Sequence, residues 1–162
     1  ALTGLHNRRT FDANLETLMH QALQSRRAFS LVFVDIDHFK RINDEHGHLV
    51  GDRVLRQLAK QLTARTRAGD AVARYGGEEF AILLPETPLH DAVQSAENIR
   101  ESIGRLNMRR TDTGTPLGTI TASFGVAEFR HGETAQELLA RADAVLYEAK
   151  RSGRNRVVSA RD

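Results

Sequence analysis

Apolar residues recur at helical spacing in four stretches of the chain. In the first stretch, residues such as Phe11 and Leu15 fall four positions apart, which predicts an amphipathic helix from about residue 7 to residue 25. The same spacing predicts helices around residues 55–62, 92–106 and 138–149. Each stretch has one apolar and one polar face, so each helix is expected to pack with one side on the core.

A different pattern, nearly continuous in apolar residues, runs from residue 28 to residue 36. Such a strand is typical of the centre of a sheet that is covered on both faces. Shorter apolar and β-branched runs predict further strands at residues 71–75, 79–84, 119–129 and 156–158. The dipeptide Gly76-Gly77 joins two of these strands, and we expect a hairpin turn there with positive φ angles.

The predicted order is helix, strand, helix, two hairpin strands, helix, strand, helix, strand. It contains the split βαββαβ pattern of ferredoxin-like sheets. We therefore expect an α/β (α+β) fold, with a mostly antiparallel sheet flanked by helices, as in nucleotidyl cyclase and polymerase palm domains. A single domain should cover residues 1–162. The polar stretch from Arg109 to Gly118 is predicted to be a surface loop.

Composition narrows the classes of function. The 162 residues are 40% hydrophobic and 27% charged, as in ordinary globular proteins. The formal net charge of +2 does not favour a nucleic-acid polymer as partner. The chain has no cysteine, which excludes thiolate chemistry and is compatible with a cytoplasmic location. No apolar run approaches the roughly 18 residues that span a bilayer, so direct membrane insertion is not expected.

The first candidate site is Asp35-Ile36-Asp37, at the end of the buried strand. Both carboxylates should point to the same side of the strand, and the Ile36 carbonyl is free to coordinate if strand pairing stops there. Oxygen ligands of this kind suit a hard cation such as Mg²⁺. The alternative is that Asp37 caps a helix beginning near His38.

The second candidate site is the hairpin, where Glu78 and Glu79 directly follow the two glycines. At such a turn the backbone can approach a phosphate closely. Two adjacent carboxylates repel each other, so a metal ion shared with Asp35 explains them better than a solvated acidic turn does.

With these motifs, the chain resembles the GGDEF family of diguanylate cyclases over nearly its whole length. The matching motifs, besides Gly76-Gly77-Glu78-Glu79-Phe80, are Leu2-Thr3-Gly4-Leu5 with Asn7-Arg8, Asp35-Ile36-Asp37-His38-Phe39-Lys40 with Asn43-Asp44, Gly47-His48, Gly51-Asp52, and Lys150 before Gly153-Arg154-Asn155. Glu78 stands where the family name has Asp, a variant that active members also use. The resemblance implies an enzyme that condenses two GTP molecules into cyclic di-GMP and two pyrophosphates.

The resemblance also implies roles for single residues. Asp35, the Ile36 carbonyl and Glu78 would bind Mg²⁺ or Mn²⁺, two ions per half-site, and Glu78 would help to deprotonate the attacking 3′-hydroxyl. Glu79 and Lys40 complete the expected catalytic group, in which cations neutralise phosphate charge. The further expected substrate contacts are Phe39, Arg74, Gly76, Gly77, Lys150 and Arg154. Taken singly, the lysines and Arg154 would instead be interpreted as solvated surface charges.

Recognition of guanine has a candidate in Asp52. Guanine presents an N1 proton and an amino group side by side, and a carboxylate can accept both. The resemblance places Asn43 and His48 at the guanine as well. The alternatives are that Asn43 is a turn or capping residue and that Asp52 is the N-cap of the next helix. A transition-metal site at His46 and His48 is not expected, because no further imidazole or thiolate has an obvious partner position.

Arg67 and Asp70 precede the hairpin and match an Arg-x-x-Asp site at which many family members bind the inhibitory product. The planar fork of an arginine suits guanine and phosphate. We expect this site to lie beside the catalytic hairpin. The alternative is a polar turn before a strand.

The expected reaction requires two GTP-loaded domains, so the resemblance implies a transient homodimer. The chain begins abruptly at Ala1-Leu2-Thr3-Gly4-Leu5, from which we expect a longer parent protein with an N-terminal sensor or regulatory domain, which could be membrane-anchored. Two other interpretations remain. One is an inactive module that senses GTP or cyclic di-GMP, and the other is a different nucleotidyl cyclase or polymerase-palm enzyme.

Overall fold

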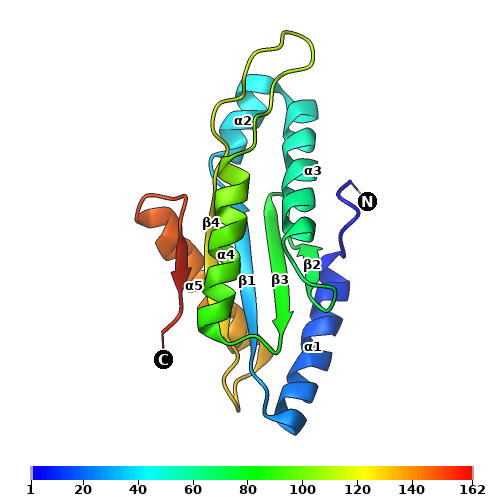
Figure 1. The fold of residues 1–162 in the computed structure, drawn as a ribbon, viewed down its shortest axis with the longest axis vertical. Coiled ribbons are helices and arrows are strands. Elements are labelled where there is room, and N and C mark those ends of the chain that lie inside the picture. The colour runs from blue at the N-terminus through cyan, green and yellow to red at the C-terminus, as the bar shows by residue number, and fades with distance from the viewer. Residues whose placement is uncertain (1, 162) are drawn as a thin grey trace.

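The computed structural model describes residues 2–161, in which a five-stranded sheet carries helices on both faces (Figure 1). The helices are α1 (Arg8–Ser25), α2 (Phe39–His46), α3 (His48–Ala64), α4 (Leu89–Gly104) and α5 (Ala135–Arg151). The strands are β1 (Phe29–Ile36), β2 (Ala71–Arg74), β3 (Glu79–Pro85), β4 (Ala122–Glu128) and β5 (Val157–Ser159).

The sheet has the strand order β2-β3-β1-β4-β5. β1 is central and pairs antiparallel with β3 and β4, and β2 pairs antiparallel with β3. Only β5, which follows α5, adds to the described sheet in parallel, beside β4. The first four strands and their connecting helices form the βαββαβ unit, which confirms the expected fold class.

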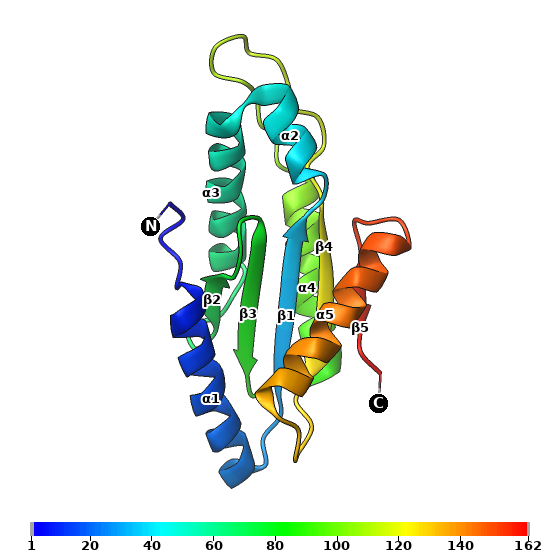
Figure 2. The ribbon, with the colours of Figure 1, turned by 180° about the vertical axis from the view of Figure 1, so that it is seen from behind.

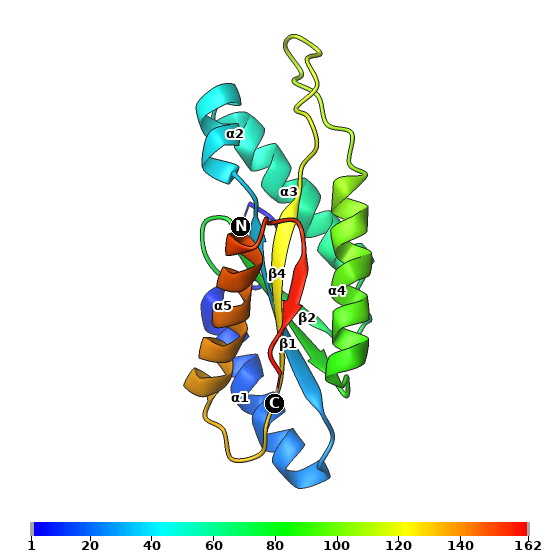
Figure 3. The same ribbon diagram turned by 90° about the vertical axis from the view of Figure 1, so that its left-hand side faces the viewer.

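All eight residues of β1 are buried. α3 and α4 cover one face of the sheet and α1 and α5 cover the other, as opposite views show (Figures 1 and 2), and the edge view separates the two layers (Figure 3). Val32 and Val34 point into the core below α3 and α4, whereas Leu31 and Phe33 point toward α1 and α5. This burial on both faces explains the continuous apolar run in the sequence.

The region after β1 differs from the expectation. The periodic pattern around residues 55–62 belongs to α3, which begins at His48, and a separate helix, α2, precedes it. α2 has one buried residue, Phe39, so its sequence carries little periodic signal. Gly47, with φ of 90°, separates the two helices. β4 also begins later than predicted, at Ala122.

The loop between α4 and β4 extends beyond the sheet, next to the start of α3 (Figure 3). Within the described loop, one isolated antiparallel β-bridge joins Arg109 to Pro116. The side chain of Arg53 on α3 donates a hydrogen bond to the Arg109 carbonyl at 3.0 Å. The prediction of a surface loop is confirmed. Among residues 2–161 no helix combines the length and apolarity that crossing a membrane requires.

Candidate active site

The candidate active site lies where β1 ends and β3 begins. Asp35 is opposite Glu79 on β3 and opposite Ser123 on β4, and it is only 4% exposed. The Ile36 N–H donates to the Glu78 carbonyl at 3.4 Å, which holds the hairpin against the end of β1. The structure thus brings together the acidic residues that the two sequence motifs supply.

Asp35 lies in an excess of negative charge. Its carboxylate accepts a hydrogen bond from the ammonium group of Lys150. Burial raises the pKa of Asp35, Lys150 lowers it, and Glu78 and Glu79 raise it again, so that the pKa rises from 3.8 to about 6. Added positive charge at this position would offset both the burial and the repulsion between carboxylates.

The Gly76-Gly77 turn depends on space and not on left-handed backbone. Neither glycine has φ between +20° and +160°, so the expected positive φ angles are wrong. A Cβ on Gly76 would stand 2.8 Å from Oε1 of Glu79, whereas a Cβ on Gly77 would meet no described atom within 4 Å. The Arg74 guanidinium closes the turn by donating to the Gly77 carbonyl from Nε at 3.2 Å and Nη2 at 2.7 Å. Gly77 therefore faces open space.

Asp37 has a different environment. It does not cap α2, whose N-cap is His38, so the capping alternative is wrong. Its carboxylate accepts hydrogen bonds from the hydroxyls of Thr121 and Ser123, both at 2.7 Å, and from the Asn155 N–H at 2.9 Å. These three donors occupy a carboxylate that is 6% exposed. Asp37 therefore does not share the open environment of the metal-ligand candidates.

The corner between α2 and α3 carries the candidates for guanine recognition. Asn43 lies inside α2, so it is not a turn residue, and a Cβ on Gly51 of α3 would stand 1.8 Å from its Oδ1. Within the described chain this buried oxygen has no hydrogen-bond partner. His48 and Asp52 lie at the start of α3, whose N-cap is Gly47, so Asp52 is not the N-cap. An unpaired buried acceptor favours a donor from a ligand.

Positive charge reaches the site from two elements. Lys40 lies exposed in the first turn of α2, and Lys150 and Arg154 come from the end of α5 and the turn after it. The Phe39 side chain is part of the core, so any contact with a ligand would come from its backbone. His38 makes no side-chain capping bond in the described structure. The first N–H groups of α2 can therefore donate to an anion.

The residues present fit a hard divalent cation. No three side chains among His, Asp and Glu gather as a metal cluster in residues 2–161. Mg²⁺, however, usually takes only one or two carboxylates and completes its shell with water and substrate phosphates. Asp35 and Glu78 can supply two carboxylates beside the Ile36 carbonyl, and Glu78 lies close enough to Asp35 to contribute to the rise of its pKa.

Arg67 and Asp70 lie at the far end of the β2–β3 hairpin, and not beside the glycine turn as expected. β3 separates the two positions, and its seven residues span roughly 20 Å. Arg67 Nη2 donates to the Pro85 carbonyl at 3.2 Å and to the Thr87 hydroxyl at 2.7 Å. The Arg67 N–H donates to Asp70 Oδ2 at 2.7 Å, so the two residues do form the polar turn of the alternative interpretation.

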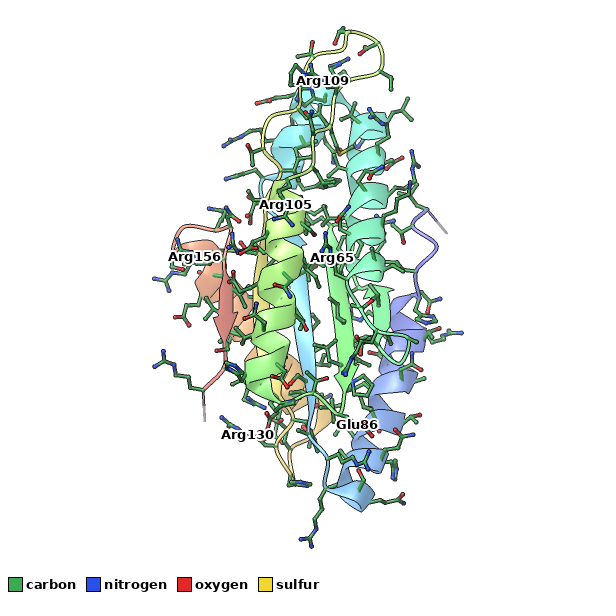
Figure 4. The ribbon with its side chains drawn as sticks, in the orientation of Figure 1. Arg65, Glu86, Arg105, Arg109, Arg130 and Arg156 are labelled. Atoms are coloured by element: carbon green, nitrogen blue, oxygen red, sulfur yellow. The ribbon has the colours of Figure 1, made fainter. Side chains whose placement is uncertain are left out.

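This turn borders a pocket of mixed charge. Arg65 follows α3 and Glu86 follows β3, and both are labelled in Figure 4. They contribute to the lining of the pocket with Arg67 and Asp70. The buried Oδ1 of Asp70 accepts no hydrogen bond from the described residues. The pocket can therefore accept a donor group from a ligand.

Three residues that hold the site together were not singled out from the sequence: Thr121, Ser123 and Arg100. Ser123 is a fully buried hydroxyl among the apolar residues of β4 that precede Glu128, and buried hydroxyls need a partner. That combination is a sequence signal that could have identified it. Arg100, which donates to the Asn155 side chain, lies on a polar helix face where arginine is unremarkable in sequence terms.

Comparison with known proteins gives a consistent result. The family model described as "Diguanylate cyclase, GGDEF domain" matches residues 1–156. The chain is 48% identical over 158 residues to Diguanylate cyclase VdcA of Vibrio cholerae, covering 98% of this chain and 45% of that protein. It is 46% identical over 160 residues to Diguanylate cyclase DgcM of Escherichia coli, covering 99% of this chain and 38% of that protein. It thus spans less than half of these relatives.

Solved structures agree in fold. The GGDEF domain of DgcB from Caulobacter crescentus, in complex with c-di-GMP, has a TM-score of 0.97 and 40% identity, covering 100% of this chain and 92% of that one. The active GGEEF domain of a diguanylate cyclase from Vibrio cholerae has a TM-score of 0.90 and 35% identity, covering 98% of this chain and 99% of that one.

Proposed function

Because this chain belongs to the GGDEF domain family of diguanylate cyclases, we propose that it joins two GTP molecules into cyclic di-GMP and releases two pyrophosphates. The observation that carries the proposal is the pairing of Asp35 with Glu79, beside Glu78, at the open end of a buried strand. The closeness of Glu78 and Glu79 to Asp35 supports it, because their repulsion contributes to the raised pKa of Asp35 and a cation shared by these carboxylates would relieve that repulsion.

The residues divide the chemistry between them. The 3′-hydroxyl oxygen of each GTP attacks the α-phosphorus of the other, a P–O bond forms, and the bond to the pyrophosphate oxygen breaks. The Glu78 carboxylate accepts the hydroxyl proton. Lys40, Lys150 and Arg154, together with the free N–H groups at the start of α2, neutralise the departing pyrophosphate. The open space at Gly77 lets the phosphates approach the backbone.

Divalent metal has a defined place in this proposal. Asp35, Glu78 and the Ile36 carbonyl would hold Mg²⁺ or Mn²⁺, two ions per half-site. Bound metal would neutralise charge on the reacting phosphates. Lys150 already balances part of the Asp35 charge, so it stands close enough to serve the same phosphates.

Guanine recognition rests on the α2–α3 corner. Asp52 accepts hydrogen bonds from the N1 proton and the amino group, and the unpaired Oδ1 of Asn43 can accept a further donor. His48 borders the same corner. ATP would present a lone pair to Asp52, so we expect strong discrimination, on the order of ten-thousand-fold.

Product control belongs to the opposite end of the β2–β3 hairpin. We infer that cyclic di-GMP binds there through Arg67 and Asp70 and inhibits synthesis. Asp70 Oδ1 accepts no hydrogen bond from the described residues and lies 3.9 Å from Arg67 Nε, and this charged pair supports the inference, because guanine supplies donors and phosphate supplies acceptors. The GGDEF domain of DgcB, which is similar to this chain, has been solved in complex with c-di-GMP.

The proposed assembly is a transient homodimer in the cytoplasm, because one chain with one GTP provides only half of the reaction. The relatives are more than twice as long as this chain, which supports an N-terminal sensor or regulatory domain in the parent protein. We propose that such a domain controls how often two half-sites meet.

The decisive experiment is incubation of the purified chain with GTP and Mg²⁺, followed by chromatographic detection of cyclic di-GMP, with ATP as the control nucleotide. Synthesis from GTP alone supports the proposal, and GTP binding without synthesis favours the inactive sensing module. Initial rates over a hundredfold dilution then test the dimer. Specific activity should fall on dilution, and a constant value would contradict transient pairing.

A further inference from the structure

The turn after α5 has an unusual backbone. Gly153, Arg154 and Asn155 have φ angles of 128°, 62° and 46°. Left-handed backbone is unfavourable for a residue with a side chain, so two such residues in succession need support from their surroundings. Arg154, a proposed phosphate ligand, is one of these two residues.

Asp37 provides one part of that support. Its Oδ2 accepts from the Asn155 N–H at 2.9 Å and from the Thr121 hydroxyl at 2.7 Å, and its Oδ1 accepts from the Ser123 hydroxyl at 2.7 Å. One buried carboxylate thereby joins the end of β1, the start of β4 and the turn. Asn155 lies 118 positions away in the sequence.

Asn155 provides a second attachment. Its side-chain oxygen accepts from Arg100 Nη1 at 3.0 Å, and Arg100 on α4 is itself held by Glu97, whose Oε2 accepts from Nε at 3.1 Å and Nη2 at 3.0 Å. On the other side, the Arg154 N–H donates to the Ala149 carbonyl at 2.9 Å, which ties the turn to the end of α5. The turn is therefore anchored on both sides of Arg154.

We propose that Asp37 is a positioning residue for the triphosphate: it acts on GTP through Arg154 by fixing the turn that carries this arginine. The inference rests on the proposed function, since it assigns Arg154 to the phosphates. The sheet itself does not depend on the Asp37 side chain, because backbone bonds hold the same segments. The Asp37 N–H donates to the Thr121 carbonyl and the Phe124 N–H donates to the Arg156 carbonyl, both at 2.9 Å.

A conservative variant separates positioning from metal binding. In Asp37→Asn the amide oxygen can accept from Asn155 and Thr121, while the amide nitrogen donates to the Ser123 hydroxyl. This variant should bind GTP within about threefold of wild type and need no additional Mg²⁺. Asp37→Ala loses all three bonds and should bind GTP about tenfold more weakly, since a misplaced arginine forfeits its charge-assisted bonds. A raised Mg²⁺ requirement in Asp37→Asn would overturn the proposal.

A double-mutant cycle with Arg154→Ala tests the route of action. The dissociation constant for GTP with Mg²⁺ is measured by calorimetry, independently of synthesis. If Asp37 acts through Arg154, Asp37→Ala should add almost nothing to Arg154→Ala. Additive effects, or unchanged GTP binding by Asp37→Ala, would refute the inference. Failure of the wild-type chain to make cyclic di-GMP would refute the proposed function. The double-mutant cycle could still be interpreted, because it measures GTP binding and not synthesis.

Two controls test whether the variants keep the wild-type fold. Amide hydrogen exchange at Asn155 should be fast in Asp37→Ala and protected in Asp37→Asn, while the β1 and β4 amides stay protected in both. If Asp37→Ala does not fold, Thr121→Val replaces it, because valine removes one donor to Asp37 and preserves shape. It should weaken GTP binding about threefold, and an unchanged dissociation constant would count against the proposal.

Discussion

Two turns bring charged residues to the active site, and they are built in opposite ways. The Gly76-Gly77 turn has ordinary backbone angles and empty space around Gly77, and one arginine closes it. The turn from Gly153 to Asn155 has left-handed backbone throughout, and two side chains support it, Asp37 after β1 and Arg100 on α4. The first turn should be sensitive to added atoms and the second to lost partners.

The largest expected effect comes from the open turn. Glu78→Ala removes the proposed base and metal ligand, so synthesis of cyclic di-GMP should fall by at least about a hundredfold. The free energy of unfolding should change by less than about 0.5 kcal/mol, because no core group is removed. Product chromatography and urea unfolding measure the two quantities.

The matched control is Glu16→Ala, on α1, where the glutamate is exposed and lies outside both proposed sites. It should keep the wild-type rate. Appreciable synthesis by Glu78→Ala at ordinary Mg²⁺ concentration would contradict the role of Glu78.

The next largest effects are expected from alanine substitutions at Gly76 and Gly77, which should change different kinetic constants. Alanine at position 76 would place its Cβ 2.8 Å from the Glu79 carboxylate, and displacement of that group should lower kcat about tenfold. Alanine at position 77 meets no described atom within 4 Å, so Gly77→Ala should fold normally and act mainly on the KM for GTP. Steady-state kinetics of both variants test this. Identical changes in kcat and KM would show that space is not what distinguishes them.

Asp35 gives a smaller effect on stability, which depends on pH. Its pKa of about 6 in the fold, above the reference value of 3.8, means that folding favours the protonated acid. Its stabilising contribution is complete below pH 3.8 and is lost as the pH rises through 6. Asp35→Asn imitates the protonated form, so in EDTA it should be roughly 1–2 kcal/mol more stable than wild type at pH 7.5. Urea unfolding should show no such difference near pH 4. An equal difference in the free energy of unfolding at both pH values would contradict the raised pKa of Asp35.

The smallest effect on basal synthesis is expected at the far end of the hairpin. Arg67→Ala removes the planar donor of the proposed product site, some 20 Å from the reacting groups by the length of β3. The initial rate should stay within about twofold of wild type, and inhibition by added cyclic di-GMP should weaken about tenfold or more. Superimposable inhibition curves would reduce Arg67 to a turn residue.

Sequence patterns predicted the sheet well because its strands are strongly apolar. β1 could be recognised from its unbroken run, since helices bury both of its faces. The start of α2 near His38 can be expected from the sequence, but its separation from α3 cannot, because eight residues with one buried side chain give no clear period. The expected positive φ angles at Gly76 and Gly77 are wrong, because four residues, 75–78, join the two strands, whereas positive φ angles are typical of two-residue turns.

The site was predicted unevenly for a related reason. Local motifs identified Asp35, Glu78 and Glu79, whose proximity follows from strand pairing. The environment of Asp37 could not be predicted, because its partners lie 84 to 118 positions away. The distance between Arg67 and the glycine turn is also difficult to predict. An extended strand lies between them in the sequence, and an extended strand spans a long distance with few residues.

The central position of β1 has a mechanical consequence. A slip of this strand by one residue would exchange its two differently packed buried faces and break its pairing with both β3 and β4, so Asp35 and Glu79 cannot change register to switch activity on or off. The domain is therefore expected to respond to signals as a rigid body. A signal would change the distance and the orientation between this domain and the second domain of the proposed dimer, and not the internal structure of either one.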